Sequence, residues 1–324
     1  MLFDPLLQRL RPDPWSAQHL WANAEDLSPE VWFRIGEHEY NNKAMNQAEA
    51  WWNLAADAGV DGAMFYLGLM YRASGRLDEA EDWYTRAAEA GEPSAMQNLA
   101  IMLEQSGRLD EAEGWWTRAA EDGIPSAMYG VGHLLDAAGR KQEAEKWYYS
   151  AALAGDTSAM HNLAMRLEES GRLDEAEGWW TRAAKAGHIS AMLGLGRLLS
   201  RAPRVEEAEV WWTRAAKAGE PTAMYALGLL LNKQGRTVEA KDWWTRSARA
   251  GNADAVRQLT VTALEEGQLA EAEGWCLPAA ESGQTDAMVL LGFVHHLAGR
   301  EEEAQDWWTR AVEMQSKEEE SGRP

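Results

Sequence analysis

The feature that most constrains this chain is a repeated segment. Residues 107 to 120 read GRLDEAEGWWTRAA, and the same fourteen letters return at residues 171 to 184. Looser copies place a pair of large residues at a constant spacing of 32, beginning at positions 51, 83, 115, 147, 179, 211, 243, 275 and 307. A fixed period of this length predicts a linear array of repeats rather than several independent globular domains.

The array divides into nine repeats of 32 residues, which cover residues 29–316. In each repeat a first helix is predicted to begin near a Ser or Thr such as Ser94 and to end at a glycine such as Gly107. A second helix runs through the large pair and stops at another glycine, such as Gly123. In the third repeat, three- and four-residue spacing predicts burial of Ala95, Met96, Leu99, Leu103, Leu109, Ala112, Trp116 and Ala119. One hairpin cannot bury both of its faces, so the hairpins are expected to stack.

Both ends of the array differ from its middle. Residues 1–28 are predicted to form a cap of two short helices, because Asp4-Pro5 and Asp13-Pro14 each place an acid before a proline at a helix start. Residues 317–324 form a polar tail without a glycine stop. The last helix would leave the flank with Trp307 and Trp308 partly open, and association of two copies through an array end is one hypothesis.

The eighth repeat departs most from the pattern. Cys276 replaces the second tryptophan and Pro278 falls inside the second helix. A proline there removes a backbone hydrogen bond, at a cost of about 3 kcal/mol, and usually kinks the helix. A bend in the array and tolerated decay near its end are equally weighted interpretations.

The segment WWTRAAEDGIPSAM (residues 115–128) resembles a known repeat family, because an aromatic pair, an Ala-Ala and a Gly lead into the next helix. The pattern resembles tetratricopeptide repeats and is similar in particular to Sel1-like repeats, although its period of 32 is shorter than the usual 34. The resemblance implies an all-α, right-handed α-solenoid of nine helical hairpins. It also implies that the first helices line a concave surface, with positions 94, 97, 101, 104 and 105 of the third repeat pointing into it.

Composition limits the classes of partner. The formal net charge of −21 disfavours nucleic acids and anionic lipids, and it favours a protein or peptide of basic or mixed charge. A single cysteine excludes an intramolecular disulfide framework. The amino-terminal residues do not resemble a signal peptide, and no apolar run is long enough to span a membrane, so we expect a cytoplasmic protein.

No constellation of residues predicts catalysis. The sequence has no glycine-rich phosphate loop and no nucleophile elbow, so we expect neither an enzyme nor a bound cofactor. The recurring acids Asp110, Glu111 and Glu113 are interpreted as a solvated face that also suits the helix dipole. His133 and His161 could share a metal, but solvated or hydrogen-bonded histidines are the preferred interpretation. The tryptophan pairs are interpreted as core rather than as an aromatic box for a ligand.

The predicted groove positions vary from repeat to repeat while the core positions do not, which favours a protein-interaction scaffold that binds a peptide or protein. Drift of exposed residues without selection is the alternative explanation of this variation. A self-assembling structural protein and a sensor of a small ligand or peptide signal are the alternative functions. The candidate groove residues are Gln97, Ile101, Glu104, Tyr129, His133, Asp136, His161, Met165, Glu168, Arg197, Arg201, Tyr225, Lys233 and Arg257.

Overall fold

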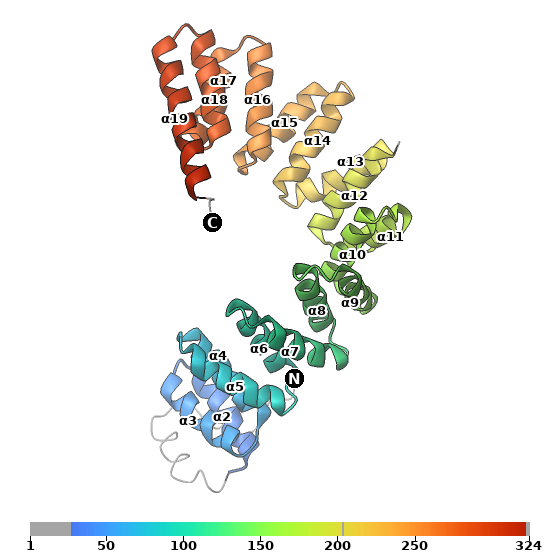
Figure 1. The fold of residues 1–324 in the computed structure, drawn as a ribbon, viewed down its shortest axis with the longest axis vertical. Helices are drawn as coiled ribbons and strands as arrows, with labels where there is room; N and C mark the ends of the chain where they lie inside the picture. The colour runs from blue at the N-terminus through green and yellow to red at the C-terminus, as the bar shows by residue number, and fades with distance from the viewer. Residues whose placement is uncertain (1–26, 203, 322–324) are drawn as a thin grey trace. The chain divides into compact units, whose positions relative to one another are not determined.

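The computed structural model describes residues 27–202 and 204–321, and within these ranges it contains eighteen helices and no strand. The predicted amino-terminal cap therefore lies almost wholly outside the described residues. The helices form nine hairpins, each with a first and a second helix, and the chain divides into two compact parts, residues 1–156 and 157–324. The all-α repeat architecture expected from the sequence is confirmed (Figure 1).

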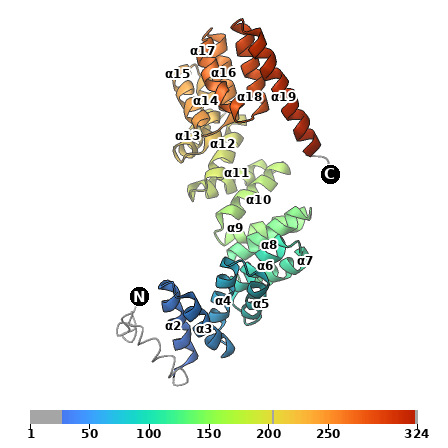
Figure 2. The same ribbon diagram turned by 90° about the vertical axis from the view of Figure 1, so that its left-hand side faces the viewer.

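The N-terminal part holds four hairpins. Their helices are α2 (Pro29–Asn41) and α3 (Met45–Asp57), α4 (Asp61–Ala73) and α5 (Leu77–Glu89), α6 (Pro93–Gln105) and α7 (Leu109–Glu121), and α8 (Pro125–Ala137) and α9 (Lys141–Leu153). Each helix packs on the next one along the chain, both within a hairpin and between neighbouring hairpins of this part (Figure 2).

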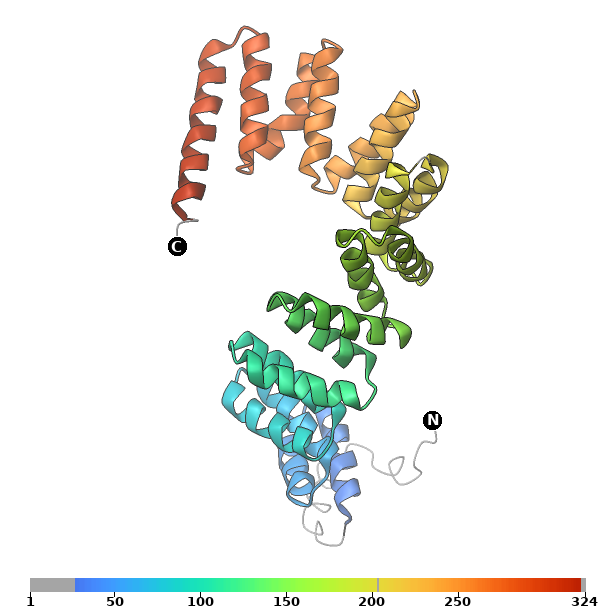
Figure 3. The same ribbon diagram turned by 45° about the vertical axis from the view of Figure 1, so that its right-hand side comes forward.

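The C-terminal part holds five hairpins packed in the same way. Their helices are α10 (Thr157–Glu169) and α11 (Leu173–Lys185), α12 (Ile189–Arg201) and α13 (Val205–Lys217), α14 (Pro221–Lys233) and α15 (Thr237–Arg249), α16 (Ala253–Glu265) and α17 (Leu269–Glu281), and α18 (Thr285–Leu297) and α19 (Glu301–Ser321). The last helix has 21 residues and reaches well beyond α18, so it extends into the predicted polar tail (Figure 3).

Helix ends follow the predicted glycine signals. After α4, Gly75 has a φ of +77°, which a residue with a Cβ rarely adopts. Its N–H donates to the carbonyl of Arg72 at 3.1 Å, and the N–H of Arg76 donates to the carbonyl of Tyr71 at 2.9 Å. These two bonds satisfy carbonyl groups that the helix itself leaves unpaired. Four first helices, α2, α6, α8 and α14, start with a proline, and in α6 the Glu92 side chain also accepts from the N–H of Ser94.

The predicted core of the third repeat is confirmed at every position but one. Leu99 and Leu103 on α6, and Ala112 and Trp116 on α7, are buried, as are Ala95, Met96 and Ala119. Leu109 was expected to join them, but its side chain is 51% exposed. It is the first residue of α7, so although it shares a face with Ala112 it lies at the end of the hairpin, beyond the packed helices.

Buried tryptophans fit because small residues face them. Trp116 lies against Gly130 of the next hairpin, where an added Cβ would sit 2.7 Å from the indole ring. In the C-terminal part, Trp180 lies against Gly194 in the same way, at 2.8 Å. A contact this close leaves no room for a side chain, so glycine is required for the hairpins to stack at this distance.

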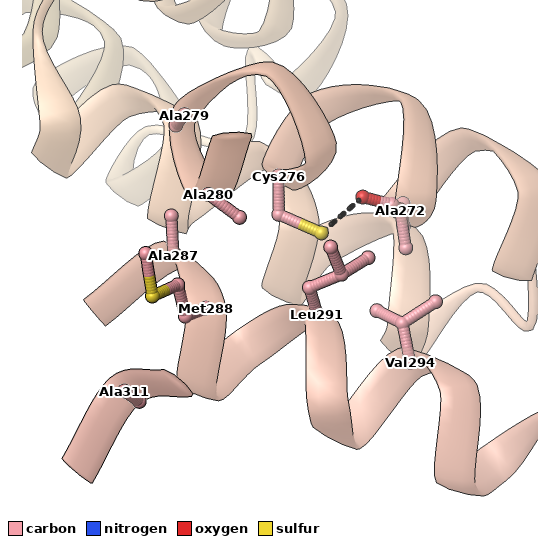
Figure 4. Packing of buried hydrophobic residues seen from close by; sticks show 10 residues of the cluster. Ala272, Cys276, Ala279, Ala280, Ala287, Met288, Leu291, Val294 and Ala311 are labelled. Carbon is pink, nitrogen blue, oxygen red and sulfur yellow. Dashed lines mark hydrogen bonds between the residues drawn. The ribbon is translucent and has the colours of Figure 1, made fainter. Parts of the chain in front are cut away.

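The eighth repeat keeps a helical core despite its substitutions (Figure 4). Cys276 is fully buried against Leu291 and its thiol donates to the carbonyl of Ala272 at 3.1 Å. Burial raises the pKa of this thiol to about 12, so it stays protonated at neutral pH. Helix α17 continues through Pro278 from Leu269 to Glu281.

Candidate functional site

The candidate site is the outward face of the first helices. In α6 the buried residues Ala95, Leu99 and Leu103 are spaced by four, so Gln97, Ile101 and Glu104 fall on the opposite side or at its edges. Equivalent positions recur every 32 residues along the first helices. The surface is therefore a set of short rows, one row from each hairpin.

In the N-terminal part, four candidate residues contact other side chains of the protein. Gln97 accepts from the Ser126 hydroxyl of the next hairpin at 2.8 Å, and Glu104 accepts from the indole N–H of Trp116 at 2.6 Å. The rings of Tyr129 and His133 stack at a centroid distance of 6.1 Å. Ile101 and Asp136 are half-buried at the edge of the same face.

In the C-terminal part, three candidate residues meet. Arg197 donates through both of its terminal nitrogens to Glu168 of the preceding hairpin, at 2.8 and 2.7 Å, and Arg201 donates to the same carboxylate at 3.0 Å. The Glu168 side chain is only 12% exposed. The positive charge of these two arginines is thus partly neutralised, because one well-covered carboxylate holds both guanidinium groups.

The other candidates of this part lie on α10, α14 and α16. Met165 is 42% exposed, Lys233 is exposed, and Tyr225 is half-buried. Arg257 pairs with Asp254 of its own helix at 2.6 Å. Burial, with a smaller contribution from Asp254, raises the pKa of the Tyr225 hydroxyl, so this group stays a neutral hydrogen-bonding group at physiological pH.

His161 lies inward rather than in open solvent. Its ring contacts the Trp180 ring edge-on at 4.8 Å and stacks on His188 at 4.9 Å. Burial, and then the neighbouring His188, lower the pKa of His161 to about 4. The ring is therefore neutral at physiological pH and acts as a packing residue.

A ladder of arginines along the second helices was missed by the sequence analysis. Arg140 precedes α9, and it contacts Glu143 three residues later at 2.9 Å and Glu113 of the preceding hairpin at 2.8 Å. We call this pattern the Arg–Glu ladder, and it recurs at Arg76, Arg108, Arg204, Arg236 and Arg300. Glu111, with a side chain 56% exposed, is solvated as expected, but Glu111 and Glu113 are also ion-paired, which was not predicted. In the sequence, each rung is visible as an arginine 27 residues after the glutamate of the preceding hairpin.

The tryptophan pairs divide into two roles. In most pairs the second member is buried in the core, as predicted, for example Trp212 and Trp244. Trp83 and Trp211, first members of their pairs, are half-buried, and the guanidinium three residues later lies over each ring, at 4.0 Å for Arg86 on Trp83 and 4.7 Å for Arg214 on Trp211. A cation over an indole face is favourable, so this contact belongs to the repeat itself.

Comparison with known proteins agrees with this geometry. Profiles of the tetratricopeptide repeat match residues 54–95, 98–159, 157–186, 221–246 and 286–310, which together make up more than half of the chain. The chain belongs to the tetratricopeptide repeat family. No curated protein matches it.

The fold of these tetratricopeptide repeats is similar to that of solved Sel1-like repeat proteins, as the sequence pattern indicated. A protective antigen of uropathogenic Escherichia coli, c5321, has the Sel1-like repeat fold; it is 24% identical, has a TM-score of 0.69, and the match covers 91% of this chain and 71% of that one. A Sel1 repeat protein from Oxalobacter formigenes is 24% identical with a TM-score of 0.66, and 87% of each chain is covered. Both show that the fold is shared.

Two neighbouring second helices also border a cavity. It lies in the N-terminal part, between α5 and α7, and has a volume of about 700 Å³. Trp83 and Trp115 contribute to its walls, together with Leu99, Leu103, Glu79, Glu81, Asp82, Thr85, Arg86, Arg108 and Glu111. Glu81 and Glu111 are bound to Arg108, so part of its charge is already paired.

The described part of the chain has neither a metal-binding cluster nor a membrane-spanning helix. Among residues 27–202 and 204–321, no three His, Cys, Asp or Glu side chains are grouped so that they could hold a metal ion. In the same ranges, no helix combines the length and the apolar character needed to cross a bilayer.

Proposed function

We propose that this tetratricopeptide repeat protein is a scaffold that binds a segment of another protein along the outward face of its first helices. Repeats of this family generally serve protein–protein interaction rather than catalysis. The partner segment is either extended or helical, because both forms can present side chains to successive rows of a helical surface.

One observation carries this proposal. Met165 and Leu229 occupy the same position in first helices two repeats apart, and their side chains are 42% and 40% exposed. Arg197 stands at that position in the helix between them and is held by Glu168. Apolar side chains on both sides of a fixed charge suit a partner with two apolar anchors around a polar group, and apolar anchors supply most binding energy at such surfaces.

The net charge of the chain limits the kinds of partner that it can bind. A net charge of −21 attracts basic segments over a distance of about one Debye length, roughly 8 Å at physiological salt. Lys233, which is exposed and makes no ion pair within the described residues, would favour an acidic group at one end of the segment. A partner of mixed charge fits both features.

A matched pair of variants tests the face. Peptides selected from a random displayed library on the wild-type protein should lose affinity by about tenfold or more on Leu229→Glu, because the apolar anchor would meet a carboxylate. Val210 on α13 is 51% exposed, so Val210→Glu is an equally exposed apolar-to-acidic change on a second helix and should keep the wild-type affinity. Equal loss with both variants, or no loss with either, would count against the first-helix face.

A small-ligand sensor is the second candidate, favoured by the cavity between α5 and α7. Its volume of about 700 Å³ lies within the usual range of ligand pockets. A ligand from a small-molecule library that raises the melting temperature of the wild type, but not of a Trp83→Ala variant, would support this function. Loss of stabilisation confined to Leu229→Glu would place the ligand on the first-helix face instead.

A further inference from the structure

The outward side of α19 exposes positions that other second helices bury. Ala120, Ala184 and Ala216 are no more than 2% exposed, and the second helices that carry them, α7, α11 and α13, pack against the first helices of the next hairpins. Val312 stands at the same position in α19 and is 64% exposed. Within the described residues, no helix follows α19 to cover it.

Trp308 on this side is held as firmly as its buried counterparts. Its indole N–H donates to the carbonyl of Val289 at 3.2 Å, as that of Trp212 does to Leu193 at 3.2 Å. Its ring lies against Gly292, and the ring of Phe293 meets it edge-on at 5.4 Å. Trp308 is nevertheless only half-buried, whereas Trp180 and Trp244 are 1% exposed. The ring is thus already fixed in the position it has inside the array.

This side of α19 also lacks charge. Between residues 305 and 316, one stripe at three- and four-residue spacing consists of Gln305, Trp308, Thr309, Val312, Gln315 and Ser316, which we call the C-terminal face. Asp306 and Arg310 pair at 2.8 Å on another side of the helix. Gln305 stands where Glu209 and Glu273 of the Arg–Glu ladder stand, so α19 lacks the glutamate that would pair with an arginine of a following hairpin.

These substitutions run opposite to what a solvent-facing end needs. A terminal repeat is normally kept soluble by a polar outer face. Here the buried alanine position becomes the larger, apolar Val312, and the charged ladder position becomes the neutral Gln305. Both changes lower the cost of removing the face from water.

We propose that the C-terminal face is a two-fold dimer contact with a second copy of this chain. Two copies that each carry a charge of −21 repel one another, and an uncharged stripe removes that repulsion locally. The contact covers the side of α19 that a following hairpin covers on α13, with α19 of the second copy over Trp308 and Val312. A two-fold contact uses the same patch on both copies, so no other face is required. The inference is independent of the first-helix face.

The dimer is tested by molar mass. Sedimentation equilibrium of the full chain over a wide range of concentrations at physiological salt should show a mass that rises from 36.1 kDa toward twice that value. Val312→Glu should remain monomeric, because two carboxylates would be brought together in the contact. Val238→Glu is the control: Val238 lies on α15, is 85% exposed, and its replacement should leave the dimer intact. Unchanged helical circular dichroism and melting temperature establish that each variant is folded.

Symmetry is tested by crosslinking. In a two-fold contact residue 312 lies close to its own copy, so Val312→Cys should give a covalent dimer with a short bismaleimide, whereas Val238→Cys should not. The native Cys276 is buried and does not compete. A wild type that stays at the monomer mass throughout, or a Val312→Glu dimer, would overturn the proposed contact. A dimer without the crosslink would overturn its two-fold form.

Discussion

Lys241 donates to both carboxylate oxygens of Glu266 at 2.6 Å, and this contact reverses the charges of the Arg–Glu ladder. Lys241 stands where the neighbouring hairpins have a glutamate, and Gln268 stands where they have an arginine. An ordinary rung cannot form between Lys241 and Gln268. The Lys241–Glu266 pair takes its place, with the cation on the earlier hairpin and the carboxylate on the later one. The ladder is therefore a contact that the chain maintains by compensating changes.

Restoring the ordinary rung should be cooperative. Lys241→Glu alone places a carboxylate near Glu266 and should lower the free energy of unfolding by up to about 1 kcal/mol, the range of partly exposed pairs. Adding Gln268→Arg should recover that loss by providing the missing guanidinium. Urea unfolding of the wild type, both single variants and the double variant measures the coupling, and strictly additive effects would contradict the ladder.

Glycines in the helices should fall into two classes. Gly194→Ala forces a methyl group against the Trp180 ring, at a starting distance of 2.8 Å, and should cost about 1–3 kcal/mol. Gly178 lies in the middle of α11 with no atom within 4 Å of an added Cβ. Gly178→Ala should therefore stabilise the protein by about 0.5–1 kcal/mol. Opposite shifts in the urea midpoint check the contact, and destabilisation by both alanines would contradict it.

Acid should weaken the packing around His161. Its pKa is lowered to about 4 from the ordinary 6.5, so the unfolded chain takes up this proton before the folded one does. The contribution to stability is complete above pH 6.5 and is lost progressively as the pH falls to about 4. Other first helices carry Tyr129 or Tyr225 at this position, so His161→Tyr should fold and reduce the loss between those values. An NMR titration of the His161 ring with a midpoint near 6.5 would contradict the assignment.

Replacing Pro278 should stabilise the eighth repeat. The proline has no N–H for the helix and occupies the position where other repeats place an arginine over the first tryptophan. Pro278→Arg should regain up to about 3 kcal/mol from the helix, and it should place a guanidinium over Trp275. The melting temperature measures the first effect. Pro278→Lys is the control, because lysine also restores the helix hydrogen bond but stacks less well on the Trp275 ring. If either variant melts at a lower temperature than the wild type, the proline is required.

Local spacing made most of the fold predictable. Leu99, Leu103 and Trp116 repeat at helical intervals, and Gly75 or Gly107 marks a helix end in the sequence itself, so the hairpins and most of the core follow directly. Leu109 shows the limit of such a pattern. Periodicity assigns a residue to a face of a helix, but it does not say whether a neighbouring helix extends that far.

The candidate surface was less predictable because its contacts join different hairpins. Glu168 meets Arg197 and Arg201, which lie 29 and 33 residues later, and neither separation belongs to one helix. The Arg140 rung was missed for the same reason: acids were read within their own helix, where the dipole explains them. Compared across repeats, a constant offset between Arg140 and Glu113 would have predicted the pair.

The ladder also sets how this chain can change in length. Each regular rung joins two neighbouring repeats at the same offset, so whole repeats between two regular rungs can be removed or added without leaving a charge unpaired. Recombination between the identical stretches at residues 107–120 and 171–184 would delete two repeats and bring Glu113 to the place where Glu177 now meets Arg204. The new junction would close with a complete rung, so the gene can lengthen or shorten its product in steps that the protein tolerates.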